Sequence, residues 1–145
     1  MPRRDLVAAT VTGARQPCAG GIVHDAAGRL LLIERGRPPS LGSWSVPGGR
    51  CEPDETPEQA CAREVAEETG LIVTVGRPAG RVERDAPDGG IYVIDDFVCE
   101  LIGGTLRAGD DAADARWFDR AELMRLPLSQ GLLDCLQEWD LLPRC

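Results

Sequence analysis

The feature that most constrains how this chain folds is a helix with well-defined ends. Thr56 is a typical N-cap, Pro57 suits the first helical position, and Gln59 completes a capping box with the threonine. Gly70 is typical of a helix end and predicts a helix of about 15 residues. One side of this helix carries small and apolar residues and is expected to be buried, namely Ala60, Cys61 and Val65.

Three carboxylates occupy five consecutive positions of the same helix: Glu64, Glu67 and Glu68 fall within residues 64–68. Residues three and four apart are neighbours on a helix, so Glu64 meets both of the others at a cost of roughly 0.2–0.5 kcal/mol per pair. A solvated face paired to lysines is the usual explanation for such a cluster, but no lysine is available nearby. The alternative is a hard divalent cation held by oxygen ligands.

Size and charge narrow the class of protein. A chain of 145 residues suits one compact domain, so we expect a single domain over 1–145. A net charge of −8 and a pI of about 4.6 argue against binding nucleic acid. No apolar run approaches the ~20 residues of a membrane span, and residues 1–14 are interpreted as a first strand rather than a secretory signal. We therefore expect a cytoplasmic protein.

Cysteine is the one unusual count in the composition, with six residues. No CxxC pair occurs and His24 is the only histidine, which argues against zinc and leaves His24 as a turn or surface residue. A disulfide framework or a cysteine nucleophile would need a partner that the sequence does not reveal. The cysteines are interpreted as mostly buried thiols, and they are Cys18, Cys51, Cys61, Cys99, Cys135 and Cys145.

The remaining segments predict a mixture of strands and short helices. Apolar and β-branched runs predict strands, Gly-rich and Pro-rich segments predict turns, and a second capping box at Asp119 and Glu122 predicts a short helix. The expected strands are 17–24, 29–35, 71–75, 91–101 and 114–118, with a hairpin turn at 25–28, a loop with a short strand over 35–49, a turn at 85–90 and a closing amphipathic helix near 132–139. This order predicts one α/β domain with mixed strands.

The acidic helix also lies inside a longer pattern, which resembles the Nudix box. The pattern runs Gly49, five residues, Glu55, seven residues, Arg63-Glu64-Val65, one residue, Glu67-Glu68, one residue, Gly70-Leu71. Every fixed position over these 23 residues is filled, which makes agreement by chance very unlikely. The approach through Trp44 and Pro47-Gly48-Gly49 and the later Arg116-Trp117-Phe118 extend the resemblance to about residues 17–140.

The resemblance implies an α/β (α+β) Nudix fold, with a mixed β-sheet sandwiched between helices. It also implies a metal site that uses Mg²⁺ or Mn²⁺, with Glu64 and Glu68 as main ligands. Glu67 would share that role or polarise water, and the main-chain carbonyl of Gly48 would be a further ligand. An ion pair between Arg63 and Glu55 would fix the loop relative to the helix. Phosphoryl transfer needs positioning and charge neutralisation, which a cation between carboxylates and phosphates provides.

Other site residues are less constrained by the motif. In this family the general base is often an acidic residue on a loop well after the box, and we favour Asp111 for this role. A polar turn would explain the same residues equally well. The other acids considered are Asp110, Asp114 and Glu100. Arg35 and Arg37 either meet a substrate phosphate or are simply solvated. Trp44 either packs in the core or stacks on a base of the substrate.

Substrate class follows from the resemblance and from one proline. Pro87 lies 16 residues beyond Leu71, as in the ADP-ribose-cleaving branch, although proline also suits the turn there. We therefore expect hydrolysis of the diphosphate linkage of a nucleoside diphosphate derivative, with ADP-ribose or a similar nucleotide sugar favoured. A house-cleaning nucleoside triphosphate pyrophosphohydrolase is the alternative. A catalytically silent nucleotide-binding module is a third hypothesis, and the family also allows a homodimer.

Overall fold

The structure is a computed structural model that describes residues 14–37, 41–109 and 111–145. Its elements are β2 (Arg15–Val23), β3 (Leu30–Arg35), β4 (Trp44–Ser45), β5 (Gly48–Arg50), α1 (Pro57–Thr69), β6 (Leu71–Asp85), β7 (Ile91–Gly104), β8 (Ala112–Phe118), α2 (Arg120–Leu123) and α3 (Leu132–Glu138). The strand expected at the start of the chain falls on residues that are not described. The single domain over 1–145 includes those residues and stays a prediction.

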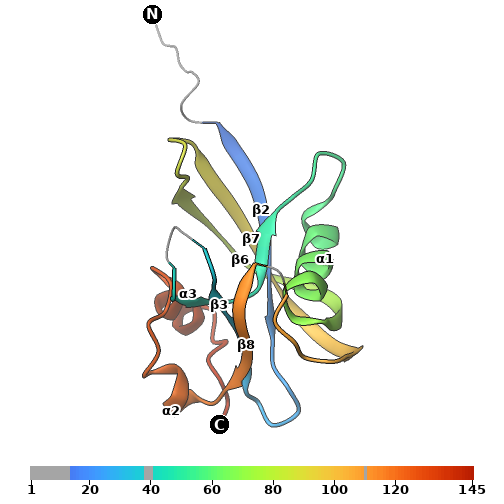
Figure 1. Ribbon diagram of the computed structural model, residues 1–145, viewed down its shortest axis with the longest axis vertical. Coiled ribbons are helices and arrows are strands. Elements are labelled where there is room, and N and C mark those ends of the chain that lie inside the picture. Colours follow the sequence, from blue (N-terminus) through green and yellow to red (C-terminus); the bar gives the residue numbers. More distant parts are fainter. Residues whose placement is uncertain (1–13, 38–40, 110) are drawn as a thin grey trace, which may run out of the picture.

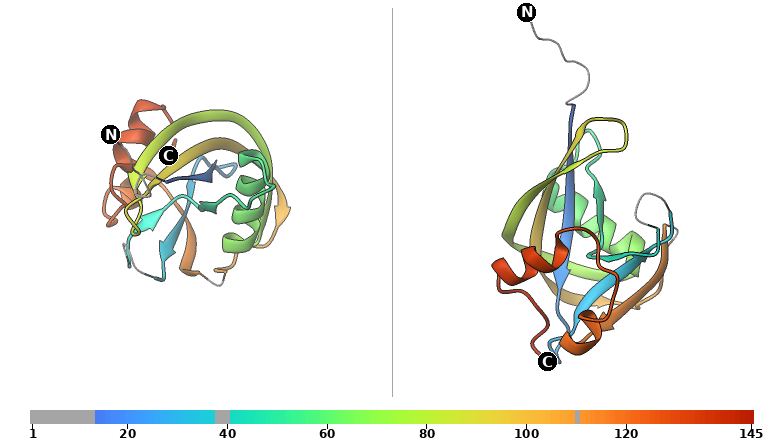
Figure 2. Two further views of the ribbon diagram at one scale, coloured as in Figure 1. Left: turned by 90° about the horizontal axis from the view of Figure 1, so that it is seen from above. Right: turned by 90° about the vertical axis from the view of Figure 1, so that its left-hand side faces the viewer.

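The described strands form two sheets. The larger sheet has the order β5-β2-β7-β6 and the smaller one β4-β3-β8. The pair β2–β7 is parallel, and the other pairs of strands are antiparallel. Helix α1 lies on one side of the larger sheet and α3 on the other, as Figure 1 and the left view of Figure 2 show. Mixed strands between helices confirm the expected fold class.

Two cores hold these layers together. The first lies between α1 and the larger sheet, and the second lies under α3, between the larger sheet and β3, β4 and β8. Successive residues of a strand point to opposite faces. Val23 accordingly joins the first core and Ile22 the second. Because β2 is apolar on both faces, it becomes an interior strand of the sheet.

Helix α1 begins and ends where its caps predicted. The Thr56 hydroxyl accepts a hydrogen bond from Gln59 N at 3.1 Å, and the Gln59 side chain accepts one from Thr56 N at 2.9 Å. Gly70 has a φ of 75°, the left-handed conformation that favours glycine at a helix end. The expected stripe of Ala60, Cys61 and Val65 is buried. Local sequence therefore accounts for the boundaries of α1.

The turn after β2 forms, but the expected hairpin does not. Gly28 N donates to Asp25 O at 2.9 Å, yet only an isolated bridge between His24 and Leu30 joins the two strands across the turn. β2 continues in the larger sheet and β3 in the smaller one. The reason is burial: residues 30–33 are buried on both faces, which requires β3 to lie between the two cores rather than beside β2.

β6 runs ten residues beyond its expected end at residue 75, to Asp85. Gly76, Pro78 and Gly80 favour a loop, but they lie at irregularities in the register between β6 and β7. β6 is an edge strand of the sheet, where a proline and bulges are tolerated.

All six cysteines are free, and no disulfide framework forms. Cys18, Cys61 and Cys99 are buried, Cys51 and Cys135 are half-buried, and Cys145 is exposed, so the expectation of buried thiols holds for half of them. No helix in the described part of the chain is long and apolar enough to cross a membrane.

Candidate active site

Two carboxyl groups of α1 meet the Gly-Gly backbone of β5. Glu68 Oε1 accepts a hydrogen bond from Gly48 N at 2.8 Å. Glu64 lies against Gly49 so closely that a Cβ at Gly49 would overlap the Glu64 carboxylate. The glycine pair therefore allows both side chains to approach one short stretch of backbone.

Burial and nearby like charges raise the pKa values of both carboxyl groups. Glu68 is 8% exposed, and burial raises its pKa to about 7; the charges of Glu64 and Asp111 add to the rise, while the Gly48 N–H and Arg35 oppose it. Burial also raises the pKa of Glu64, against the nearby charge of Arg63. A bound cation would favour the ionised form of both groups, so the electrostatics fit a cation site.

Arg63 ties the loop before α1 to the helix. Its Nε donates to Glu55 Oε2 at 2.7 Å and its Nη2 to Glu55 Oε1 at 2.8 Å, a bidentate pair. Nη2 also donates to Arg50 O at 3.0 Å. The guanidinium holds the pKa of Glu55 down at about 2, and the carboxylate raises the pKa of Arg63. The predicted pairing of these two residues is therefore present in the structure.

Glu67 differs from the other two glutamates of the cluster. Its side chain is 58% exposed, and its Oε1 accepts a hydrogen bond from Arg63 Nη1 at 3.1 Å. Arg63 Nη1 also lies 3.5 Å from Glu64 Oε2, so it bridges the two carboxylates. A role for Glu67 in binding metal or polarising water stays a prediction.

Among the described acids considered for the general base, Asp111 is the one whose charge acts on the glutamate cluster. Its charge raises the pKa of both Glu64 and Glu68. Asp114 instead accepts from Arg116 Nε at 2.6 Å, Glu100 is exposed on β7, and Asp110 is outside the described residues. The role of Asp111 as the base stays a prediction.

The two arginines expected to bind substrate lie near this loop. Arg37 is exposed and its Nη2 is 3.3 Å from Asp111 Oδ1. Arg35, at the end of β3, lowers the pKa of Glu68 through its charge. Both positions are compatible with a phosphate close to the glutamates.

Trp44 is not available to stack on a substrate. Its side chain is 8% exposed and packs edge-to-face on Phe118, with ring centroids 5.0 Å apart, in the second core. The prediction that Trp44 contacts the substrate is therefore wrong, and the alternative, a packing role, is correct. An isolated tryptophan in a sequence does not indicate which of its faces is buried.

Gly109 is a site position that no motif in the sequence predicts. Its N–H donates to Glu68 O at 3.0 Å, and a Cβ there would overlap the carbonyl oxygen of Glu67. This contact brings the loop that carries Asp111 against the end of α1. The only signal in the sequence was a glycine directly before two aspartates.

Glu64 and Glu68 fit a metal ion whose remaining ligands are waters and substrate phosphates. No three His, Cys, Asp or Glu side chains of the described residues form a complete metal cage. Mg²⁺ is usually bound by one or two carboxylates together with waters and substrate phosphates. Glu64 and Glu68 supply carboxylates of that kind, next to the backbone of Gly48 and Gly49.

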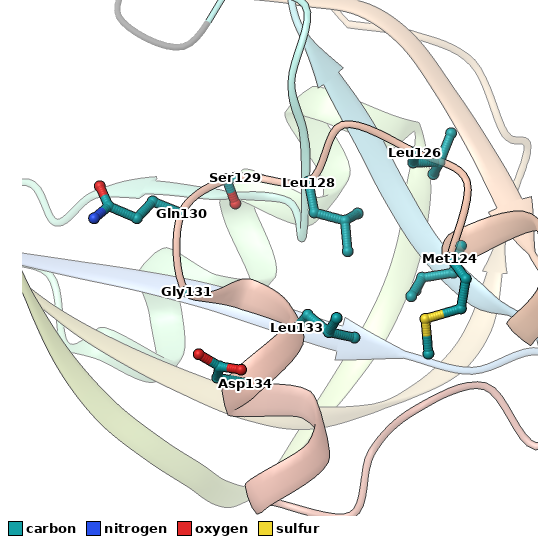
Figure 3. Close-up of a pocket in the computed structure, with 9 residues that line it drawn as sticks. Met124, Leu126, Leu128, Ser129, Gln130, Gly131, Leu133 and Asp134 are labelled. Atoms are coloured by element: carbon teal, nitrogen blue, oxygen red, sulfur yellow. The ribbon is translucent and has the colours of Figure 1, made fainter.

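A separate hollow of about 270 Å³ lies around the segment between α2 and α3 (Figure 3). Leucines predominate in its wall, together with Ser129, Gln130 and Asp134. It includes none of the glutamates or arginines described above, and so it is not the candidate active site.

Comparison with known proteins identifies the family. Residues 14–139 match the NUDIX domain family, and the chain belongs to this family. An ADP-ribose pyrophosphatase of Methanocaldococcus jannaschii is 42% identical over 101 residues, which are 68% of this chain and 59% of that protein. A MutT-like protein of Streptomyces ambofaciens is 38% identical over 80% of this chain and 73% of its own length. A CTP pyrophosphohydrolase of Escherichia coli is 32% identical over 76% of this chain and 81% of that protein.

Solved structures agree with this assignment. A MutT NUDIX hydrolase from Burkholderia pseudomallei has a TM-score of 0.76 and 28% identity, covering 86% of this chain and 97% of its own. A MutT protein from Methanosarcina mazei has a TM-score of 0.80 at 22% identity, over 90% and 96% of the two chains, and shows the shared fold. The resemblance drawn from the box is confirmed, and the relatives from Methanocaldococcus jannaschii and Escherichia coli are themselves named as a pyrophosphatase and a pyrophosphohydrolase.

Proposed function

We propose that this protein hydrolyses the diphosphate linkage of a nucleoside diphosphate derivative in the presence of Mg²⁺ or Mn²⁺, with ADP-ribose or a similar nucleotide sugar as substrate. The observation that carries the proposal is the approach of Glu64 and Glu68 to the Gly48–Gly49 backbone. The name of the Methanocaldococcus jannaschii relative supports ADP-ribose. Pro87, in the turn between β6 and β7, gives weaker support of the same kind.

In this proposal the residues divide the work between them. Glu64 and Glu68 hold the metal together with the Gly48 carbonyl, and Glu67 shares the ligation or orients water. When bound, the metal supplies positive charge that neutralises the diphosphate and activates water. Arg63 and Glu55 are positioning residues, since their bidentate pair fixes the loop against α1.

Asp111 and two arginines complete the proposed site. Asp111 accepts the proton of the attacking water, a task that suits a carboxylate on a loop facing the glutamates. Arg35 and Arg37 bind phosphate oxygens, since guanidinium groups match phosphate geometry. A homodimer and a cytoplasmic location stay predictions.

A second candidate is hydrolysis of nucleoside triphosphates to monophosphate and pyrophosphate. The Escherichia coli relative named as a CTP pyrophosphohydrolase favours it. Chromatography of products separates the two candidates across a panel of nucleotides. AMP with ribose phosphate from ADP-ribose supports the first, and release of pyrophosphate from triphosphates supports the second.

The test of the metal site is Glu68→Gln, which keeps the size of the side chain but removes its charge. We expect turnover in saturating Mg²⁺ to fall about 100-fold or more, as for loss of a group that stabilises charge in the transition state. Glu58→Gln is the matched control, because Glu58 is an exposed glutamate in the first turn of the same helix. Turnover of Glu68→Gln near that of the control would contradict the assignment. Tight nucleotide binding with no products from any substrate would instead favour the silent module.

A further inference from the structure

Asp96, in the middle of β7, is a buried carboxylate that the proposed reaction does not use. It is 7% exposed, and its Oδ1 is the one buried side-chain polar atom of the described residues that has no hydrogen-bond partner. Burying an ionisable group without a partner is unfavourable, and buried polar atoms are nearly always paired. A ligand that donates a hydrogen bond to Asp96 would remove this penalty.

The residues that line up with Asp96 across the larger sheet are glycines. The register pairs Gly20 with Gly48 on one side and with Asp96 on the other, and pairs Asp96 with Gly80. Asp96 is thus the only residue with a side chain in a row of four across the larger sheet. A Cβ at Gly20 would overlap Asp96 Oδ1 and lie 3.2 Å from Pro47 O, so the carboxylate leans toward β5.

This row lies on the face of the sheet opposite α1. A Cβ at Gly21 would contact Val65 and Cys61 of α1, so the neighbouring Gly20 faces the other way. The indole of Trp139 covers Gly80 on that opposite face. The carboxylate therefore lies beside the row of glycines that leads to the candidate active site, without touching the glutamates.

The distance from Asp96 to the proposed diphosphate site at Gly48 is about the length of one nucleoside. Neighbouring strands are about 4.8 Å apart, so the Cα atoms of Gly48 and Asp96, two strands apart, are roughly 10 Å from one another. Gly48 is the residue whose N–H binds Glu68. A nucleotide with its diphosphate at Gly48–Gly49 can extend its base along the glycine row toward β7.

We propose that Asp96 is a specificity residue that accepts a hydrogen bond from the exocyclic amino group of the substrate's nucleobase. This inference rests on the proposed function and deepens it. An ionised carboxylate only accepts hydrogen bonds, so it pairs with the 6-amino group of adenine and rejects the 6-oxo group of hypoxanthine. Burial and the charge of Asp95 raise the pKa of Asp96 to about 6, and the charge of Arg84 on β6 opposes this rise, so the carboxylate is ionised at pH 8.

Asp95 provides a matched control on the same strand. Its Oδ1 accepts from Arg81 Nε at 2.8 Å on the opposite face of β7, so its charge is already paired. Asp95→Asn and Asp96→Asn make the same chemical change at adjacent positions. Only the second alters the carboxylate that we assign to the base.

The experiment compares adenine and hypoxanthine nucleotides at pH 8. Hydrolysis of ADP-ribose and of inosine diphosphate ribose is measured with Mg²⁺, and binding of AMP and IMP is measured by calorimetry without metal. We expect the wild type to prefer the adenine compound about 10- to 100-fold in kcat/KM and in affinity, the range for a hydrogen bond to a charged group. Asp96→Asn should abolish the preference, because an amide both donates and accepts, while Asp95→Asn should retain it.

The outcomes separate the two proposals. Hydrolysis without discrimination by the wild type, or the same discrimination in Asp96→Asn, overturns the role of Asp96 and leaves the proposed function standing. Selective binding of AMP without hydrolysis of any nucleotide supports Asp96 and contradicts the proposed function. If Asp96→Asn fails to fold, as judged by circular dichroism, Asp96→Ser takes its place in the comparison, because a hydroxyl also both donates and accepts, and equal affinities of the wild type for AMP and IMP would still overturn the role of Asp96.

Discussion

At the scale of single residues, the site depends on the absence of side chains as much as on their presence. The lack of a Cβ at Gly49 leaves room for the Glu64 carboxylate, and the lack of a Cβ at Gly109 allows the loop that carries Asp111 to pack against the end of α1. The motif predicted the identities of the glutamates and the pair of Arg63 with Glu55. It did not predict that Glu68 binds the N–H of Gly48, because that contact depends on how β5 lies against α1. Motifs record residue types, whereas hydrogen bonds between distant segments follow from packing.

Asp111→Asn tests the general base at this scale. The amide cannot accept the proton of water, so we expect kcat to fall about 10²- to 10⁴-fold. Removing this charge also lowers the pKa of Glu64 and Glu68, since Asp111 raises both. The measurement is the pH profile of kcat with ADP-ribose.

Asp114→Asn is the matched control for that change. Asp114 lies on the same segment but accepts from Arg116 Nε and from its neighbour Ala115 N. We expect its kcat to remain close to that of the wild type. Equal losses in both variants would mean that the segment acts through its fold and not through an acid.

At the scale of elements, the helices were predictable and the sheet was less so. The ends of α1 and the second capping box at Asp119 follow from residues three apart, which the sequence displays directly. The second half of β6 was missed because its glycines and proline indicate a loop when read alone. Only pairing with β7 turns these residues into a bulged edge strand, and pairing partners are not visible in a single sequence.

Thr56→Ala tests the contribution of the cap of α1. Loss of the hydroxyl leaves the Gln59 N–H without its acceptor, and we expect the free energy of unfolding to fall by about 1 kcal/mol. Urea unfolding followed by circular dichroism measures the change. Thr56→Ser keeps the acceptor and should stay within a few tenths of a kcal/mol of the wild type. A serine variant as unstable as the alanine variant would refute the role of the cap.

At the scale of the whole molecule, charge links the fold to the metal. The chain has a net charge of −8, and its most buried glutamate lies in the candidate active site. In the metal-free protein the pKa of Glu68 rises from 4.5 to about 7, so the folded state holds this proton more tightly than the unfolded chain. The stability that protonated Glu68 contributes is therefore present below about pH 4.5 and is lost as pH rises through about 7.

Mg²⁺ should reverse that loss. An ion that binds only the folded protein at 100 times its Kd adds about 2.7 kcal/mol of stability. Because protons compete for Glu68, we expect Mg²⁺ to raise the Tm more at pH 8 than at pH 6. Differential scanning calorimetry at both pH values, with EDTA as the metal-free reference, measures this. The Glu68→Gln protein should show a small shift at either pH, and a large shift in that variant would place the metal elsewhere.

The parallel pairing of β2 with β7 also has a consequence for how the chain folds. It joins Arg15 to Ile91 and Val23 to Cys99, residues far apart in sequence. Contacts of such long range require closure of a large loop, and proteins dominated by them fold slowly. The β6–β7 ribbon and α1 are local and can form early, whereas the row from Gly48 to Asp96 exists only after β2 inserts between β5 and β7. We therefore expect the surface that we assign to the nucleoside to be completed late in folding.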